Sequence, residues 1–223
     1  MKFVLLLALL AWTTDAFAAA SACPPYSKAI VLNFQTETPT PTYNHNLNVA
    51  GIRNLTRGRG QGSGGPHARA VGLTSAEAIL SLRGSSLLVP FQGGSCVYMT
   101  SVGADLGWQR HEVFIASELR EGGCAYRAVL DHENQHVAIN RQTMTEFTPR
   151  IRAQIEEALH AQQPVFTRDA DQATQAIIAQ IHARTTAAVN QFTSTLDARQ
   201  SVLDTAKNYG ATSALCKDWG NTR

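Results

Sequence analysis

The second half of the chain, from Cys124 to about Tyr209, carries a helical pattern. Apolar residues recur at 3.6-residue spacing and share one face: Tyr126, Val129, Leu130, Val137, Met144 and Phe147. Thr148-Pro149 predicts the end of that helix and the start of a second one, because proline suits the first helical position. The second helix is expected to reach about Gln162. Residues 167–209 contain neither Gly nor Pro and predict one very long helix or two joined ones.

The first half of the chain favours strands instead. Three segments have the apolar or alternating pattern of short strands: residues 29–34, 96–102 and 111–116. Residues 74–83 fit either a short helix or a strand. Turns and edge structure are expected at 36–48, and a flexible glycine-rich loop at 58–65. The prediction is an α+β fold in a single domain over 21–223, with a β-rich part (21–118) and a helical part (119–223).

The N-terminus has the composition of a secretory signal. Lys2 precedes an apolar run from Phe3 to Trp12, and small residues follow it up to Ala22. We therefore exclude residues 1–20 from the fold and expect a periplasmic or secreted protein. Because no second long apolar stretch follows, no stable membrane insertion is expected after signal cleavage. A formal charge of +2 without Lys/Arg blocks also argues against a nucleic-acid partner.

Four cysteines remain after the signal: Cys23, Cys96, Cys124 and Cys216. An even number in an exported chain favours two disulfides, and the sequence leaves all three pairings open. We favour Cys96 with Cys124 and Cys23 with Cys216. A lipid-modified Cys23 is the alternative, but the usual leucine three residues before the cysteine is absent, and lipidation would leave an unpaired thiol.

The motif that carries chemistry is His132-Glu133-Asn134-Gln135-His136, an H-E-x-x-H sequence inside the predicted helix. Histidines four residues apart lie on one helical face, so both imidazoles can reach one Zn²⁺. Zinc lowers the pKa of a bound water to about 7, and the adjacent carboxylate of Glu133 can take its proton. The motif predicts a zinc site with His132 and His136 as ligands and Glu133 as general base.

A catalytic zinc needs a third protein ligand. The metzincin class is disfavoured, because Ile139 and Gln142 stand where that class has Gly and His. The gluzincin class takes a Glu from a following helix, and Glu156 stands at that distance. A helical hairpin turning near Thr148 would bring Glu156 back beside His136. Glu156 is therefore the predicted third ligand, with Asp204 as the alternative.

The segment from Val129 to Val137, followed by long helices, resembles a bacterial family of secreted zinc-dependent-protease-like domains. Members typically have a later Y-D-x-x-T-x-H-G segment, and residues 203–210 correspond to it over a resemblance that covers about residues 110–216. Asp204 and Gly210 match, whereas Leu203, Lys207 and Tyr209 differ. The resemblance implies Asp204 as a ligand if the late Asp of the family binds metal. One unbroken helix from Thr167 would carry Asp204 tens of ångströms away, at about 1.5 Å per residue, so this requires the helix to fold back.

Two functions follow as hypotheses. The first is an exported zinc-dependent metallohydrolase, a peptidase that acts on a peptide or protein substrate with activated water. The second is a non-catalytic cell-envelope protein whose helices form a partner-binding surface.

Elsewhere, His111-Glu112 is interpreted as a solvated pair. The strand at 111–116 fits either an edge for an extended peptide or an ordinary sheet strand. For Tyr209, contact with an oxyanion and an ordinary packed role both remain open.

Overall fold

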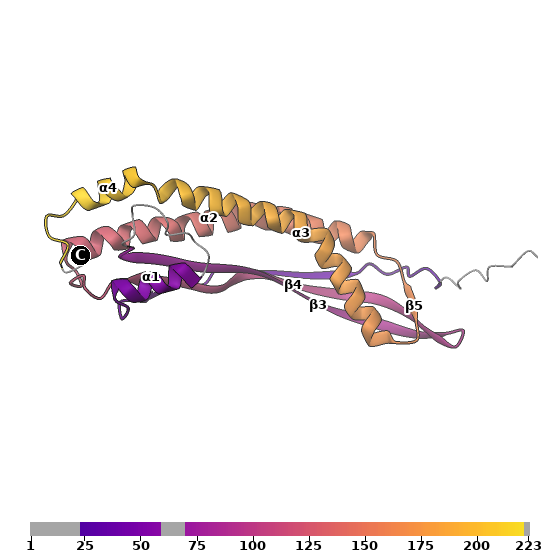
Figure 1. Cartoon of the computed structure of the whole chain (residues 1–223). Helices are drawn as coiled ribbons and strands as arrows, with labels where there is room; N and C mark the ends of the chain where they lie inside the picture. The colour runs from indigo at the N-terminus through magenta and orange to yellow at the C-terminus, as the bar shows by residue number, and fades with distance from the viewer. Residues whose placement is uncertain (1–22, 59–69, 221–223) are drawn as a thin grey trace, which may run out of the picture.

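The computed structural model describes residues 23–58 and 70–220. The predicted signal segment and, beyond its first residue, the predicted glycine-rich loop lie outside these ranges. The architecture is α+β, as predicted: an elongated mixed sheet is covered by two long helices that run in opposite directions (Figure 1).

The sheet is organised around β4 (Gly94–Ile115), which is its central strand. Along one side β4 pairs antiparallel with β3 (Gly72–Phe91) over the full length of both strands. Along the other side it pairs in parallel with β1 (Val31–Glu37) and β2 (Thr42–Asn44), and antiparallel with the short β5 (Val165–Thr167). The strands predicted at 96–102 and 111–116 are thus parts of one strand, because continuous pairing with β3 also orders the residues between them.

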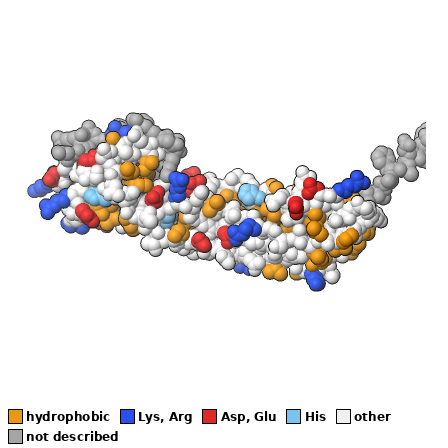
Figure 2. All heavy atoms as spheres, turned by 90° about the horizontal axis from the view of Figure 1, so that it is seen from below, with side chains coloured by type: hydrophobic (Ala, Val, Ile, Leu, Met, Phe, Trp, Pro, Cys, Tyr) orange, Lys and Arg blue, Asp and Glu red, His pale blue; other side chains and the backbone are white. Residues whose placement is uncertain are grey.

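The β3–β4 hairpin turns at Gln92-Gly93, where both residues have positive φ. Near this turn four large apolar side chains remain exposed: Leu87, Leu88, Val89 and Phe166. Figure 2 shows hydrophobic side chains gathered toward the right-hand end, where the tip of the hairpin lies in Figure 1.

Residues 74–83, for which helix and strand were both open, belong to β3. The helix α1 (Val49–Gly58) was not predicted; the Glu118 carboxylate accepts from the Val49 N–H at its start.

Helix α2 (Cys124–His160) is continuous, and the predicted break at Thr148-Pro149 is wrong. Pro149 removes the hydrogen bond to the Thr145 carbonyl, but both residues are exposed, so water can satisfy that carbonyl. On the opposite face Phe147 and Ile151 are fully buried on either side of the proline. Packing of this continuous apolar face outweighs the local cost of the proline, which is about 3 kcal/mol in a helix interior.

The Gly- and Pro-free segment forms two helices, α3 (Ala170–Leu203) and α4 (Ala206–Ala214). Asp169 caps α3 by accepting from the Gln172 N–H, and Thr205 caps α4 in the same way from Asn208. Because α3 returns along α2, its C-terminal end lies beside the first half of α2 (Figure 1). The expected need for a fold-back within this helix is wrong: α3 is unbroken, and it carries Asp204 to the histidines because it starts beyond the far end of α2 and runs back along it.

Two clusters of buried side chains form the core. The larger joins β4, the second half of α2 and α3, and includes Trp108, Phe147, Ile151, Ile177 and Phe192. The smaller lies under the start of α2 and includes Ile52, Val113, Ile115, Leu119 and Val129. The H-E-x-x-H turn of α2 therefore has packed core on both sides along the helix, which fixes its orientation.

The disulfides join Cys23 to Cys96 and Cys124 to Cys216, so the favoured pairing is wrong. Cys23 precedes β1, which runs beside β4, and Cys216 follows α4, which lies near the start of α2; the chain path thus brings each pair together. All four cysteines are paired, which indicates an oxidising, extracytoplasmic compartment. Among the described helices, none combines the length and apolar character that a membrane crossing needs.

Candidate metal centre

His132 and His136 lie on successive turns of α2 and face the α3–α4 junction. Both side chains are buried, and their Nε2 atoms are 3.3 Å apart. Val129 and Val137, which flank the histidines along the helix, pack into the smaller core cluster. The helix therefore cannot rotate to point these imidazoles elsewhere without exposing apolar surface.

Asp204 completes the group from the end of α3. Its Oδ1 atom lies 3.3 Å from His132 Nε2 and 3.0 Å from His136 Nε2. A tetrahedral zinc ion with bonds of about 2.0–2.1 Å separates its ligand atoms by about 3.3 Å. Three mutual separations of 3.0–3.3 Å thus match the base of such a tetrahedron. Among the described residues, His132, His136 and Asp204 are the group with the geometry to hold a metal ion.

A chain of hydrogen-bonded polar side chains contacts His136 at its Nδ1 atom. The His136 Nδ1–H donates to Gln200 Oε1, which leaves Nε2, the atom that faces Asp204, to bind a metal ion. Gln200 Nε2 donates to Asn140 Oδ1 at 2.6 Å, and Asn140 Nδ2 lies 3.3 Å from His111 Nε2. His111 is buried, so its interpretation as a solvated residue is wrong. This support orients a metal ligand, as outer hydrogen bonds commonly do in zinc sites.

Gln200→Ala is expected to weaken zinc binding by about 10–100-fold, because His136 would lose the acceptor that fixes its tautomer. Competition with a chromophoric chelator measures this affinity. The matched control is Gln191→Ala, an exposed glutamine on the same helix. Equal affinity in the Gln200 and Gln191 variants would show that Gln200 does not orient the ligand.

Glu133 is buried beside the two histidines and faces β3 rather than α3. Its Oε2 accepts from the Thr74 hydroxyl at 2.8 Å. Burial raises the pKa of Glu133, although the His136 and His132 charges and the Thr74 hydrogen bond act in the opposite direction. A carboxyl group with a raised pKa is suited to accept and return a proton near neutral pH.

Gly72 leaves the space that Glu133 occupies. A Cβ atom at this position would lie 2.5 Å from Glu133 Oε1 and 2.6 Å from Val129 Cγ1, closer than any real contact. The strand therefore comes against the H-E-x-x-H turn of α2 at a residue without a side chain. Gly72 and Thr74 were not predicted as site residues, because only the pairing of β3 in the sheet places them beside Glu133.

Gly72→Ala is expected to displace the Glu133 carboxylate and to lower any hydrolytic rate about 10-fold or more, with zinc still bound. Rates and zinc content are measured on the same preparation. Gly84→Ala is the matched control, since its Cβ would crowd Met99 and Ile178 further along β3, away from the histidines. Equal losses in both variants would mean that the effect of Gly72 is one of stability alone.

Asp204 and His136 shift each other's pKa. Burial alone would raise the pKa of Asp204, but hydrogen bonds with His132, His136 and Tyr209 outweigh it and hold that pKa well below its usual range. Burial lowers the pKa of His136, yet the contact with Asp204 and the charge of Glu133 reverse this, so the net shift is upward. Asp204 thus remains an anion, and the pocket between the three side chains favours a cation.

Tyr209 approaches the group from the first turn of α4. Its phenol donates to Asp204 Oδ1 at 2.7 Å. Burial, followed by this hydrogen bond and by the carboxylates of Asp204 and Glu133, raises the pKa of Tyr209 above its usual value. The phenol therefore stays protonated and acts as a donor at neutral pH.

The predicted third ligand, Glu156, lies far from this group. It is half-exposed and forms an ion pair with Arg152 at 2.9 Å. Because α2 does not turn at Pro149, Glu156 is 20 residues beyond His136 on one helix, or about 30 Å along it at about 1.5 Å per residue. The structure brings Asp204, the alternative ligand, to the histidines instead.

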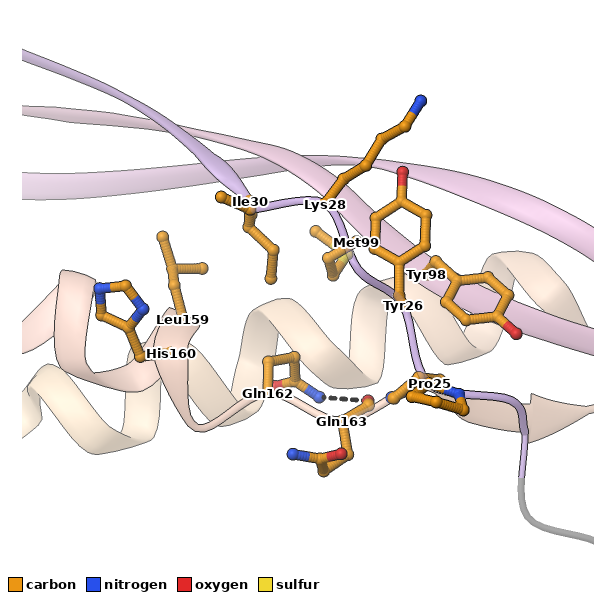
Figure 3. Close-up of a pocket in the computed structure, with 12 residues that line it drawn as sticks. Pro25, Tyr26, Lys28, Ile30, Tyr98, Met99, Leu159, His160, Gln162 and Gln163 are labelled. Atoms are coloured by element: carbon orange, nitrogen blue, oxygen red, sulfur yellow. Dashed lines mark hydrogen bonds between the residues drawn. The ribbon is translucent and has the colours of Figure 1, made fainter.

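A separate hollow of about 260 Å³ lies at the other end of α2 (Figure 3). Tyr26, Lys28 and Ile30 of the N-terminal segment line one side, and Leu159 and His160 line another. None of its lining residues belongs to the histidine–aspartate group, and it holds no cluster of metal-binding side chains. The candidate site is therefore the group at the α2, α3 and α4 junction.

No match to this chain is found among protein-family models, curated proteins or solved structures. The functional argument accordingly depends on the geometry of the site.

Proposed function

We propose that this chain is a zinc-dependent hydrolase that cleaves peptide bonds with water. The observation that carries the proposal is the convergence of His132 Nε2, His136 Nε2 and Asp204 Oδ1 at separations of 3.0–3.3 Å, beside the buried carboxylate of Glu133. Two imidazoles, one carboxylate and an adjacent base form the donor set of a catalytic zinc site.

The donor types favour zinc over other common cations. Imidazole nitrogen suits zinc and other late transition metals, whereas calcium and magnesium take oxygen ligands. Cysteine ligands are excluded, because all four cysteines form disulfides. Three protein ligands leave a fourth position open, which distinguishes a catalytic zinc site from a closed structural one. When bound, zinc would acidify a water molecule and polarise a substrate carbonyl.

The residues of the chain account for the movement of the proton. Glu133, which is buried and adjacent to His132 in the sequence, accepts a proton from the attacking water. It then returns that proton to the amine nitrogen as the C–N bond breaks, so its charge is the same before and after the cycle. Thr74 donates to Glu133 Oε2 and holds the carboxylate in place, and burial keeps bulk water away from it.

An extended peptide is the substrate shape that suits the surroundings of the site. Among the described strands β3 pairs only with β4, so its outer edge can accept hydrogen bonds from an extended chain close to Thr74 and Glu133. For the strand at 111–116, a peptide-binding edge and an ordinary sheet strand were both open. It is an ordinary sheet strand, because β4 is paired on both sides there. Asp204 is the most solvent-exposed member of the metal group: its side chain is 42% exposed, whereas those of the two histidines are 8% exposed.

The test measures zinc and hydrolysis on the same purified protein. We expect about one equivalent of zinc, cleavage of casein or of a mixed fluorogenic peptide library, loss of cleavage with 1,10-phenanthroline, and recovery when zinc is added. Less than about a tenth of an equivalent of zinc, with no gain on adding it, would instead favour the non-catalytic envelope protein. Zinc binding without cleavage of any peptide would exclude the peptidase and leave a metal-binding protein.

A further inference from the structure

Tyr209 is held at the metal group by a rigid corner of the chain. Between α3 and α4, Asn208 Nδ2 donates to the carbonyls of Val202 and Leu203, each at 3.1 Å. The Asn208 N–H in turn donates to Thr205 Oγ1 at 3.3 Å. These bonds satisfy the last carbonyls of α3 and start α4 immediately afterwards. The position of Tyr209 relative to Asp204 is therefore determined by the corner and does not depend on a mobile loop.

The phenol of Tyr209 lies at the rim of the ligand triangle. Its oxygen is 2.7 Å from Asp204 Oδ1, the same atom that is 3.0 Å from His136 Nε2. Its ring packs against that of His132, with centroids 5.5 Å apart and planes inclined by 40°. Two contacts with two different ligand residues thus hold the hydroxyl at the edge of the ligand triangle, on Asp204 Oδ1.

Glu133 and Tyr209 approach this position from different elements. Glu133 projects from α2 toward Thr74 of β3, whereas Tyr209 comes from α4. One group is a carboxylate that takes a proton, and the other is a neutral phenol that donates a hydrogen bond. A carbonyl placed between them would have its attacking water next to the base and its oxygen next to the donor.

The geometry points to Tyr209 as a catalytic residue that donates a hydrogen bond to the substrate carbonyl oxygen as this oxygen gains negative charge. This inference rests on the proposed function. The electron pair of the C=O bond moves onto the oxygen during attack and returns when the C–N bond breaks. Before substrate binds, the phenol donates to Asp204 Oδ1, and it would redirect this hydrogen bond to the substrate oxygen. It keeps its proton throughout, since Glu133 carries the proton that is transferred. Donors aimed at a developing oxyanion are among the largest contributions to catalysis.

The decisive variant is Tyr209→Phe, which removes the hydroxyl and retains the ring against His132. We expect zinc affinity to fall by no more than about 10–100-fold, the cost of one lost outer hydrogen bond to Asp204. At saturating zinc, kcat is expected to fall by about 10²–10³-fold with little change in KM. Tyr43→Phe is the matched control: this phenol donates to Asn134 of the same helical turn and is not in contact with the metal group. The control is expected to retain its activity.

A second measurement needs no turnover. Dimethylphosphinate is a tetrahedral anion that mimics the hydrated amide, and its binding to zinc-loaded protein is measured by calorimetry. Tyr209→Phe is expected to weaken this binding about 10-fold, as loss of a hydrogen bond to a charged group does. Tyr43→Phe is expected to bind it normally.

The outcomes separate this inference from the hydrolase proposal. Normal phosphinate binding by zinc-saturated Tyr209→Phe protein overturns the inference. So does an unchanged kcat at saturating zinc, which would make Tyr209 a positioning residue for Asp204. Unmodified protein that binds zinc and phosphinate but cleaves no peptide overturns the hydrolase and retains Tyr209 as the anion donor. Unmodified protein that binds neither zinc nor phosphinate overturns both.

Discussion

Glu133→Gln protein is expected to bind zinc normally and to hydrolyse peptides about 10²–10⁴-fold more slowly than the unmodified protein. The amide has the size of the carboxylate and can still accept the hydrogen bond from Thr74, so the fold and the three ligands should be unchanged. It cannot accept a proton from water, however. Removing a buried carboxylate with a raised pKa also removes a desolvation cost, so the free energy of unfolding should be equal or slightly higher.

The measurements are initial rates on a fluorogenic peptide, zinc content and the midpoint of thermal unfolding. Glu157→Gln is the matched control, because Glu157 lies on the same helix but is exposed and bonded only to Gln154. A Glu133→Gln protein that retains a tenth or more of the activity would remove Glu133 as the base, even if zinc binding proved correct. Similar losses in both variants would indicate an unrelated effect on folding.

The central part of the site could be predicted from sequence because it is local. His132, Glu133 and His136 lie within five consecutive residues, and helical geometry alone places the two histidines on one face. The division into a β-rich half and a helical half was predictable for the same reason, since each pattern repeats over a few residues. The structure confirms the α+β class and brings both histidines together.

The rest of the site depends on long-range packing. The choice between Glu156 and Asp204 depended on whether α2 turns at Pro149. The sequence alone cannot show that this proline is exposed and lies opposite a buried apolar face, which is why the helix continues through it. Gln200 precedes Asp204 by one helical turn, so the two share a face, but nothing local shows that this face meets His136. The contact arises because α3 returns along α2.

The disulfides show the same limit. From the sequence we favoured a link between Cys96 and Cys124, but these residues lie on different elements and pair elsewhere. Cys124–Cys216 ties the start of α2 to the segment after α4, across 92 residues. Because Asp204 and Tyr209 lie between α3 and that link, the disulfide also restrains the corner that delivers them to the histidines.

Asp204→Asn protein is expected to bind zinc at least about 100-fold more weakly than the unmodified protein. Losing an outer hydrogen-bond partner alone costs about 10–100-fold, and here a ligand loses its negative charge. The amide preserves the size of the side chain and an oxygen that can accept from Tyr209, so the α3–α4 corner should remain folded. Chelator competition gives the affinity, and circular dichroism confirms that the helices remain.

Glu156→Gln is the control that decides between the two candidate third ligands. Its carboxylate is paired with Arg152 about 30 Å along α2 from His136, at about 1.5 Å per residue, so the substitution should leave zinc affinity unchanged. An exposed ion pair of this kind contributes about 1 kcal/mol or less to stability, so folding should also be unaffected. If Glu156→Gln lost zinc and Asp204→Asn retained it, α2 would have to turn near Pro149 in solution. The arrangement of α2, α3 and α4 on which the whole site depends would then be incorrect.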